Sequence, residues 1–171
     1  MRMKKFFKTI FIFLFVTNLY AATTSGDNSK DTSGGNTTDK LTFYKSAEKR
    51  ILKAKKHEKK GKIKKANKFY KEALEYLYKA NKENSLDPDT LNYLGFTTRK
   101  LGNFEDAEIY YNMGLKLNPN HVGINEYLGE LYVQTNRLDK AKERLRILEN
   151  CNCEEYKELK DIIEGKKESK Y

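Results

Sequence analysis

The two cysteines of the chain, Cys151 and Cys153, are separated by a single residue in the segment NCNCEEY. Thiols at this spacing can form a disulfide, do redox work, bind a metal or pack as buried groups. Two thiolates are only half of the ligand set of a tetrahedral zinc site, so the pair does not predict a metal centre. A disulfide over so short a span is tight, and closing a small loop contributes little entropic stabilisation.

The remaining residues form no catalytic constellation. His57 and His121 are far apart in sequence, and neither belongs to a pair with metal-ligand spacing, so we expect both to be solvated surface histidines. The chain contains no Gly-rich phosphate loop and no nucleophile elbow, and its carboxylates fall mostly on predicted polar helix faces. We therefore predict a protein that is not an enzyme and uses no cofactor.

The first 22 residues have the organisation of a secretory signal peptide. A short apolar run, Ile10 to Val16, follows a basic segment and precedes small residues, and the charges of the basic segment are Arg2, Lys4, Lys5 and Lys8. This run is shorter than the roughly 20 residues that a membrane-spanning helix needs. We expect cleavage and export, in a bacterium to the periplasm, and the alternative is an uncleaved signal that anchors the protein to the membrane.

Residues 23–40 are expected to form a disordered leader, because they carry no large apolar side chain with which to offset the entropy of ordering. Export would also place the cysteines where disulfides persist.

Positive charge is concentrated in the front half of the predicted mature chain. Residues 41–83 carry 15 Lys or Arg against 5 acidic residues, whereas residues 84–171 carry 13 against 16. Lysine-rich helices are commonly solvated faces, and an exported protein meets little nucleic acid, so we expect no nucleic-acid partner. An anionic envelope surface held by the basic helices 45–71 is an alternative function.

Two segments of the chain are copies of one pattern, Leu91–Asn120 and Asn125–Asn152. Aligned on their shared Tyr-Leu-Gly, they place equivalent glycines and alanines 34 residues apart. Apolar residues recur at helical spacing in each half of each copy, which predicts two amphipathic helices joined by a tight turn. Because glycine weakens a helix, we expect Gly95 and Gly129 to lie opposite Ala107 and Ala141 and to let the helices approach closely.

The pattern resembles the tetratricopeptide repeat (TPR), a helix pair with Leu-Gly in its first helix, a Gly-x-aromatic turn, and Ala, an aromatic residue and Pro afterwards. The matching residues of the first copy are Leu94, Gly95, Gly102, Phe104, Ala107, Tyr111, Gly114 and Pro119. Those of the second copy are Leu128, Gly129, Tyr132, Leu138, Ala141 and Leu145. A weaker copy precedes them, with Ala54, Gly61, Ile63, Ala66, Tyr70, Ala73 and Leu74.

The resemblance implies an all-α fold, a right-handed superhelical array of TPR-like helix-turn-helix repeats. Its parts are a degenerate pair over 41–84 with an extended second helix, repeats over 88–121 and 122–153, and a capping helix over 154–166. Ala66 and Ala107 lie 41 residues apart, which predicts about two extra turns in that second helix. Tyr156, Leu159, Ile162 and Ile163 give the capping helix one apolar stripe, as an array end requires.

The resemblance also implies a function, a scaffold or adaptor that binds a peptide or protein in the cell envelope. In TPR proteins the first helix of each repeat lines the binding groove, and the corresponding residues here are Lys55, Glu58, Asn92, Phe96, Arg99, Glu126, Glu130 and Gln134. We expect Asn92, Phe96 and Arg99 to anchor the partner. At the turn before the capping helix, Cys151 and Cys153 are expected to form a disulfide or to pack as buried thiols, with thiol redox work as a further alternative.

Overall fold

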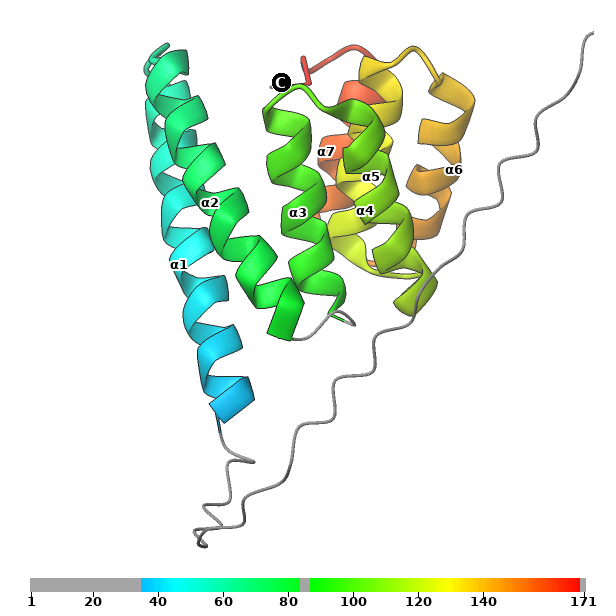
Figure 1. Ribbon diagram of the computed structural model, residues 1–171. Coiled ribbons are helices and arrows are strands. Elements are labelled where there is room, and N and C mark those ends of the chain that lie inside the picture. The colour runs from blue at the N-terminus through cyan, green and yellow to red at the C-terminus, as the bar shows by residue number, and fades with distance from the viewer. Residues whose placement is uncertain (1–34, 84–86, 170–171) are drawn as a thin grey trace, which may run out of the picture. The chain divides into compact units, whose positions relative to one another are not determined.

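The computed structural model describes residues 35–83 and 87–169, and in this part of the chain every regular element is an α-helix (Figure 1). The helices are α1 (Gly35–Glu58), α2 (Ile63–Glu83), α3 (Pro88–Lys100), α4 (Phe104–Leu117), α5 (Val122–Gln134), α6 (Leu138–Leu148) and α7 (Glu154–Ile163). None of these described helices is long and apolar enough to cross a membrane.

Only part of the N-terminal segment for which we made predictions lies within the described residues. The signal peptide, residues 1–22, and the leader up to residue 34 lie outside the described residues. The prediction that the leader extends to residue 40 is wrong, because α1 begins at Gly35. Once a helix has nucleated, each further residue adds a backbone hydrogen bond, so a helix can continue into sequence with no apolar stripe of its own.

The helices form successive pairs with the predicted repeat. Helices α3 and α5 begin at Pro88 and Val122, and α4 and α6 begin at Phe104 and Leu138, in both cases 34 residues apart. Packing is most extensive within the pairs α1–α2, α3–α4 and α5–α6, and α7 covers α5 and α6. The predicted all-α fold class, TPR-like helix pairs followed by a capping helix, is confirmed. Helix α2 has 21 residues where α4 has 14, which accommodates the longer spacing between the first two pairs.

The two full repeats begin with capped helices. Asp87 precedes α3 and accepts a hydrogen bond from the Thr90 backbone N–H at 3.2 Å, and Pro88 occupies the first helical position. His121 precedes α5 in the same way, with Nδ1 accepting from the Ile124 N–H at 3.2 Å. A side chain that satisfies a free N–H at a helix start typically contributes about 1 kcal/mol.

Neither histidine is the solvated surface residue that the sequence suggested. The other ring nitrogen of His121, Nε2, lies 3.0 Å from Asp89 Oδ1, so this cap also joins α5 to the start of α3. His57 is half-buried and stacks on the Phe69 ring, with centroids 5.3 Å apart. Partial burial lowers the pKa of His57, and nearby lysines lower it further.

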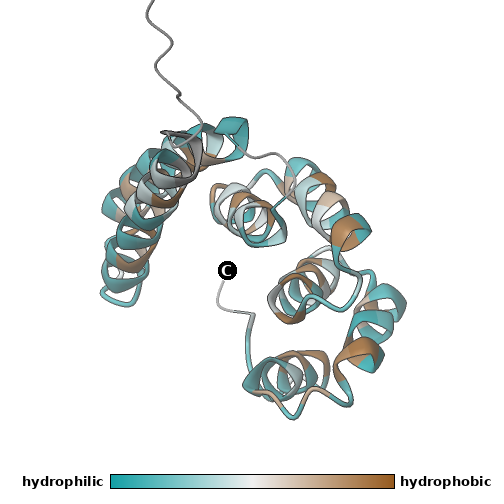
Figure 2. Ribbon diagram, turned by 90° about the horizontal axis from the view of Figure 1, so that it is seen from below, coloured by the Kyte–Doolittle hydropathy of each residue, from teal (hydrophilic) through white to brown (hydrophobic). Residues whose placement is uncertain are grey.

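Two apolar clusters form the core. One joins α1, α2 and α3 and the other joins α4, α5 and α6, and Tyr127 packs against both. Figure 2 shows apolar residues gathered in strips along the helices, as the repeat pattern predicts. Aromatic rings cross from the first pair to the third: Tyr70 meets Phe96 edge-on at 6.1 Å, and Phe96 lies 5.0 Å from Tyr127.

The glycines of the first helices make room for larger side chains than predicted. A Cβ on Gly95 would lie 2.5 Å from a ring carbon of Tyr111, and one on Gly129 would lie 2.5 Å from a methyl of Leu159. The expectation that these glycines face Ala107 and Ala141 is therefore wrong. The alignment could locate the glycines but could not reveal which side chain fills the space that each leaves.

We predict that Gly95→Ala lowers stability although alanine favours a helix more than glycine does. The added methyl overlaps the buried Tyr111 ring, and overpacking of this kind costs about 1–3 kcal/mol, against a propensity gain of about 1 kcal/mol. Urea unfolding measures the difference. The control is Asn112→Ala on the exposed side of α4, which should leave stability unchanged or raise it slightly. A Gly95→Ala variant more stable than the wild type would contradict this explanation.

Candidate functional site

The structure brings together most of the charged residues that were predicted to line a groove. All eight predicted positions lie on α1, α3 and α5, the first helices of the three pairs, and six of them form a cluster with one unpredicted lysine. We call this set the inner cluster: Lys55, Glu58, Arg99, Lys100, Glu126, Glu130 and Gln134. Several of its members form ion pairs or hydrogen bonds with one another and are therefore not free to bind a partner.

Phe96, the predicted anchor of a partner, is part of the core. Its exposed fraction is 0%, and its ring is enclosed by Tyr70, by Tyr127 and by Lys55, whose Nζ lies 4.5 Å from the ring centroid. The prediction that Phe96 contacts a partner is therefore wrong. Whether a helical residue is exposed depends on how the neighbouring helix pairs pack against it. The spacing of residues within α3 alone therefore could not reveal that the first pair covers this ring.

Arg99 is also buried, with 2% of the residue exposed, and it joins α3 to α5. Its Nη2 donates to Glu130 Oε2 at 3.0 Å, and its Nη1 donates to Gln134 Oε1 at 3.4 Å. Burying two charges is costly unless they are paired and hydrogen-bonded, so the pair holds the orientation of both helices. Arg99 is thus a positioning residue of the inner face and is not accessible to a partner.

Glu58 is held by the same kind of contact between α1 and α3. It pairs with Lys100 and accepts a hydrogen bond from the Tyr70 hydroxyl at 3.0 Å. Burial lowers the pKa of Lys100 to about 8, opposed by its contact with Glu58. Lys100 was not among the predicted residues, since it ends α3 like any solvated lysine and only the position of α1 shows that it is enclosed. Burial likewise lowers the pKa of Lys55, against the attraction of Glu126 and Glu130.

Asn92 lies apart from the inner cluster, where α3 meets α5. A Cβ on Gly123 would come within 2.8 Å of its Nδ2, so the glycine at the start of α5 makes room for the amide. Its Oδ1 is buried and has no hydrogen-bond partner in the described part of the chain. Asn92 and Arg99 therefore do not form a common anchor for a partner.

Glu126 differs from the other carboxylates of the inner cluster. The residue is only 8% exposed, and within the described ranges its carboxylate forms no hydrogen bond or ion pair. Burial raises the pKa of Glu126 to about 8, and Glu130, Glu155 and Glu158 raise it further, with Arg99 acting in the opposite direction. A glutamate is rarely buried without a partner, so Glu126 marks the position where a compensating cation is missing.

Glu126 opens into a concavity between α5, α7 and the segment that follows α7. We call it the acidic pocket; its volume is about 250 Å³, and it is lined by Glu126, Tyr127, Glu130, Glu154, Glu155, Glu158, Ile162, Lys167 and Glu168. Six of these residues are glutamates and one is a lysine. The sequence predicted Glu126 and Glu130, but it gave no sign that the capping helix would add three further carboxylates.

The segment that follows α7, residues 164–169, folds back on the acidic pocket and can be followed in Figure 1. We call it the tail. Gly165 has a φ of +69° and reverses the chain at the end of α7, as glycine does at many helix ends. Lys167 then pairs with Glu158 in α7, and the Ser169 hydroxyl lies 3.4 Å from Glu130 Oε2.

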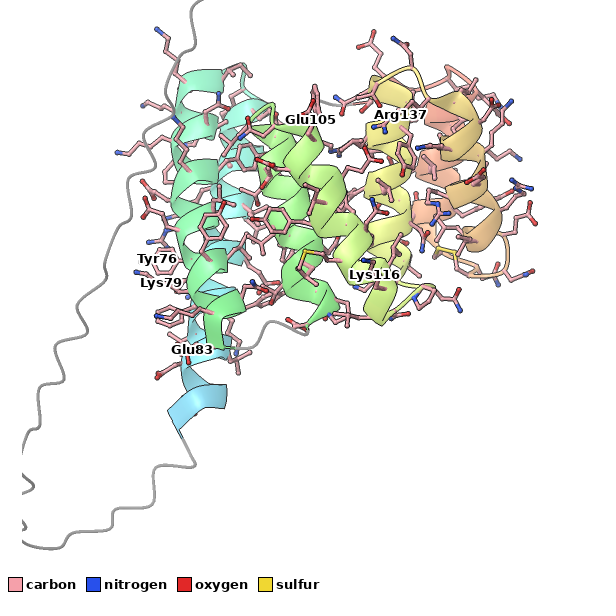
Figure 3. All side chains as sticks on the ribbon, turned by 45° about the vertical axis from the view of Figure 1, so that its right-hand side comes forward. Tyr76, Lys79, Glu83, Glu105, Lys116 and Arg137 are labelled. Carbon is pink, nitrogen blue, oxygen red and sulfur yellow. A yellow bond between two sulfur atoms is a disulfide. The ribbon has the colours of Figure 1, made fainter. Side chains whose placement is uncertain are left out.

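The cysteines lie at the turn between α6 and α7. They form a disulfide with a Cα to Cα distance of 5.1 Å, seen as a bond between two sulfur atoms in Figure 3. Cys153 is the residue before the first turn of α7, and Asn152 between the cysteines has a φ of +53°. The bridge thus constrains the entry to α7. In the described part of the chain no group of His, Cys, Asp and Glu has an arrangement that could hold a metal ion.

The helix pairs, the capping helix and the pocket on the inner face define a helical-repeat protein of TPR-like architecture. No family model and no curated protein sequence matches the chain. Similar solved structures are TPR proteins and TPR-like chaperones.

One similar structure is the first TPR of Spaghetti (RPAP3) bound to the HSP90 peptide SRMEEVD, with 23% identity, a TM-score of 0.47, and coverage of 71% of this chain and 94% of that one. A tetratricopeptide repeat protein from Parabacteroides merdae has 22% identity and a TM-score of 0.49 over 70% and 59%. The Yersinia enterocolitica type III secretion chaperone SycD, in complex with a peptide of the translocator YopD, has 19% identity and a TM-score of 0.46 over 71% and 88%.

We predict that Phe96→Ala lowers the free energy of unfolding by about 3–5 kcal/mol, because it empties a fully enclosed ring site. The control is Leu52→Ala on α1, where the side chain is 67% exposed and the change should stay within about 0.5 kcal/mol. Thermal or urea unfolding compares them. Equal stability of Phe96→Ala and the wild type would show that the ring is accessible after all.

We predict that Glu126→Gln stabilises the protein in alkaline solution. The folded-state pKa of about 8 exceeds the ordinary value of 4.5, so the wild type loses stability as pH rises between these values and the unfolded chain releases its proton first. The difference in unfolding free energy between Glu126→Gln and wild type should be near zero below pH 4.5. It should grow to a few kcal/mol above pH 8, on the order expected from the difference between the two pKa values.

Urea unfolding at several pH values tests this prediction. Glu154→Gln, which removes an exposed carboxylate of the same pocket, controls for the change in net charge. A stability difference between Glu126→Gln and wild type that does not depend on pH would contradict it.

Proposed function

We propose that the protein is an exported, non-enzymatic scaffold that binds a peptide or protein partner on the inner face of its helix pairs, with the acidic pocket as the contact site. The observation that supports the proposal most directly is the opening of Glu126 and Glu130, two predicted groove residues, into a concavity. A groove lined by the first helices agrees with the way in which helical-repeat proteins use their inner surfaces.

Burial narrows the proposed contact site to one end of the inner face. Phe96 and Arg99 are enclosed, and Glu58 is paired with Lys100, so none of the three offers an accessible group on α1 or α3. The accessible polar groups lie where α5 meets α7. Glu154 is exposed there, and Glu155 and Glu158 are half-buried. A partner that binds at the pocket therefore contacts the last pair and the capping helix.

Export remains a proposal based on the first 22 residues, with periplasmic localisation and cleavage of the signal as its simplest form. The disulfide between Cys151 and Cys153 supports it, because disulfides are rare in reducing compartments and persist in oxidising ones.

A second candidate function is attachment to an anionic envelope surface through α1. Leu52 is 67% exposed and lies beside a shallow concavity with four lysines, Lys55, Lys56, Lys59 and Lys60. An exposed apolar side chain among lysines suits a headgroup surface. Salt separates the two candidates, because attraction between exposed charges is screened over about 8 Å at physiological ionic strength.

Crosslinking in cells tests the scaffold proposal. A photoreactive phenylalanine analogue at position 154, exposed at the acidic pocket, should give a protein adduct of defined size. The same analogue at position 109, on the outer side of α4 where Ile109 is 57% exposed, should not give that adduct.

The adduct should persist when cells are washed in about 0.5 M salt before illumination, where exposed charge attraction is largely screened. Adducts from neither position, together with salt-sensitive release of the protein from membranes, would contradict the scaffold and favour surface attachment.

A further inference from the structure

We propose that the acidic pocket binds a lysine or arginine side chain from a basic segment of the partner protein, and that the tail occupies the edge of the pocket through Lys167 until that segment binds. The inference rests on the proposed scaffold function and names the chemistry of its ligand. It is supported by the missing charge at Glu126, by the composition of the pocket and by the weakness of the tail contacts.

The missing charge is the first argument. Glu126 is more than nine-tenths buried and lines the pocket, yet it has no hydrogen bond or ion pair within residues 35–83 and 87–169. Lys55 and Arg99 attract Glu126 only at a distance, because Lys55 Nζ lies over the Phe96 ring and Arg99 binds Glu130. A cation that enters the pocket would therefore gain a buried partner whose desolvation is already incurred in the folded protein.

The composition of the pocket fits a long basic side chain. Glutamates from α5, α7 and the tail supply oxygen acceptors, while Tyr127 and the buried Ile162 supply apolar surface. Lysine and arginine need both, because their methylene stems pack on apolar surface while the charged end binds acceptors. The volume of about 250 Å³ lies below the range of about 300–1,000 Å³ typical of small-molecule sites, which favours a single inserted side chain.

The tail already demonstrates that an ammonium group is accommodated there. Lys167 pairs with Glu158 at the edge of the pocket, where each side chain is 30% exposed. Ion pairs with this exposure contribute about 0–1 kcal/mol, so the Lys167 side chain can be displaced from Glu158. Lys167 pairs with Glu158 and not with Glu126, which leaves the buried Glu126 carboxylate for an incoming side chain.

Binding of a fluorescein-labelled pentalysine peptide to the full-length protein, followed by anisotropy at low salt, tests the inference. Wild type should bind pentalysine and not pentaglutamate. Lys167→Ala should tighten pentalysine binding about 3- to 10-fold, because an internal competitor is removed. Glu126→Gln should weaken it at least about 5-fold.

Glu105→Gln, on the exposed start of α4 (labelled in Figure 3), is the control with the same change in net charge and should bind like the wild type. Since Glu126→Gln is expected to stabilise the fold, weaker binding by this variant would not reflect unfolding.

Three outcomes would overturn the inference. Equal binding by wild type, Glu126→Gln and Glu105→Gln would mean that pentalysine binds non-specifically to the negative charge of the surface. Spermine that displaces the peptide and shows the same dependence on Glu126 at lower concentration would mean a polyamine site. Self-association in sedimentation that disappears in Glu126→Gln would identify the ligand as the lysines of a second copy.

The scaffold proposal is tested separately. If pentalysine fails to bind but the analogue at position 154 still captures a protein, the scaffold stands and only the basic ligand is wrong. If pentalysine binds but no adduct forms in cells, the pocket has its chemistry and the scaffold proposal fails.

Discussion

The buried contact between Arg99 and Glu130 is the interaction on which the inner face depends. Each helix pair exposes one apolar side, and the next pair must cover it, so charged residues on the first helices are enclosed when the pairs pack. Arg99 and Glu130 resolve this conflict by meeting at 3.0 Å across α3 and α5. Glu58 and Lys100 do the same across α1 and α3. The charges that a groove would need for a partner are thereby used to join the pairs to one another.

This internal use of charge determines where a partner can bind. Along most of the inner face a ligand would have to break a buried ion pair, and separating such a pair costs about 3–5 kcal/mol because one charge stays behind uncompensated. The pair α5–α6 is covered by α7, which contributes carboxylates to the pocket in place of cations. The ionic network is therefore incomplete at this end, and a ligand can bind there without first breaking a buried ion pair, because it displaces only the partly exposed contact of Lys167 with Glu158.

Sequence periodicity was sufficient for the fold and insufficient for the site. The 34-residue repeat of glycines and alanines, the extra length of α2 and the apolar stripe of α7 depend on local patterns that a single chain displays. The burial of Phe96 and the partner of Glu58 depend on how one pair lies on the next, which the repeat pattern does not encode. The same limit explains Gly95 and Gly129: the alignment shows that space is needed, and only the packing shows that Tyr111 and Leu159 fill it.

The uneven distribution of charge along the chain is explained by the ion pairs between the helix pairs. The first pair is rich in lysine, the capping helix and tail are rich in glutamate, and the two paired sites lie between them. Within the inner cluster Arg99 and Lys100 each have a carboxylate, Glu130 and Glu58, and Glu126 is the one left over among the described residues. An unpaired buried carboxylate is destabilising unless a ligand supplies the missing cation. The free protein is destabilised by this carboxylate, and a bound cation removes the destabilisation. The free energy regained on binding adds to the affinity for a basic ligand.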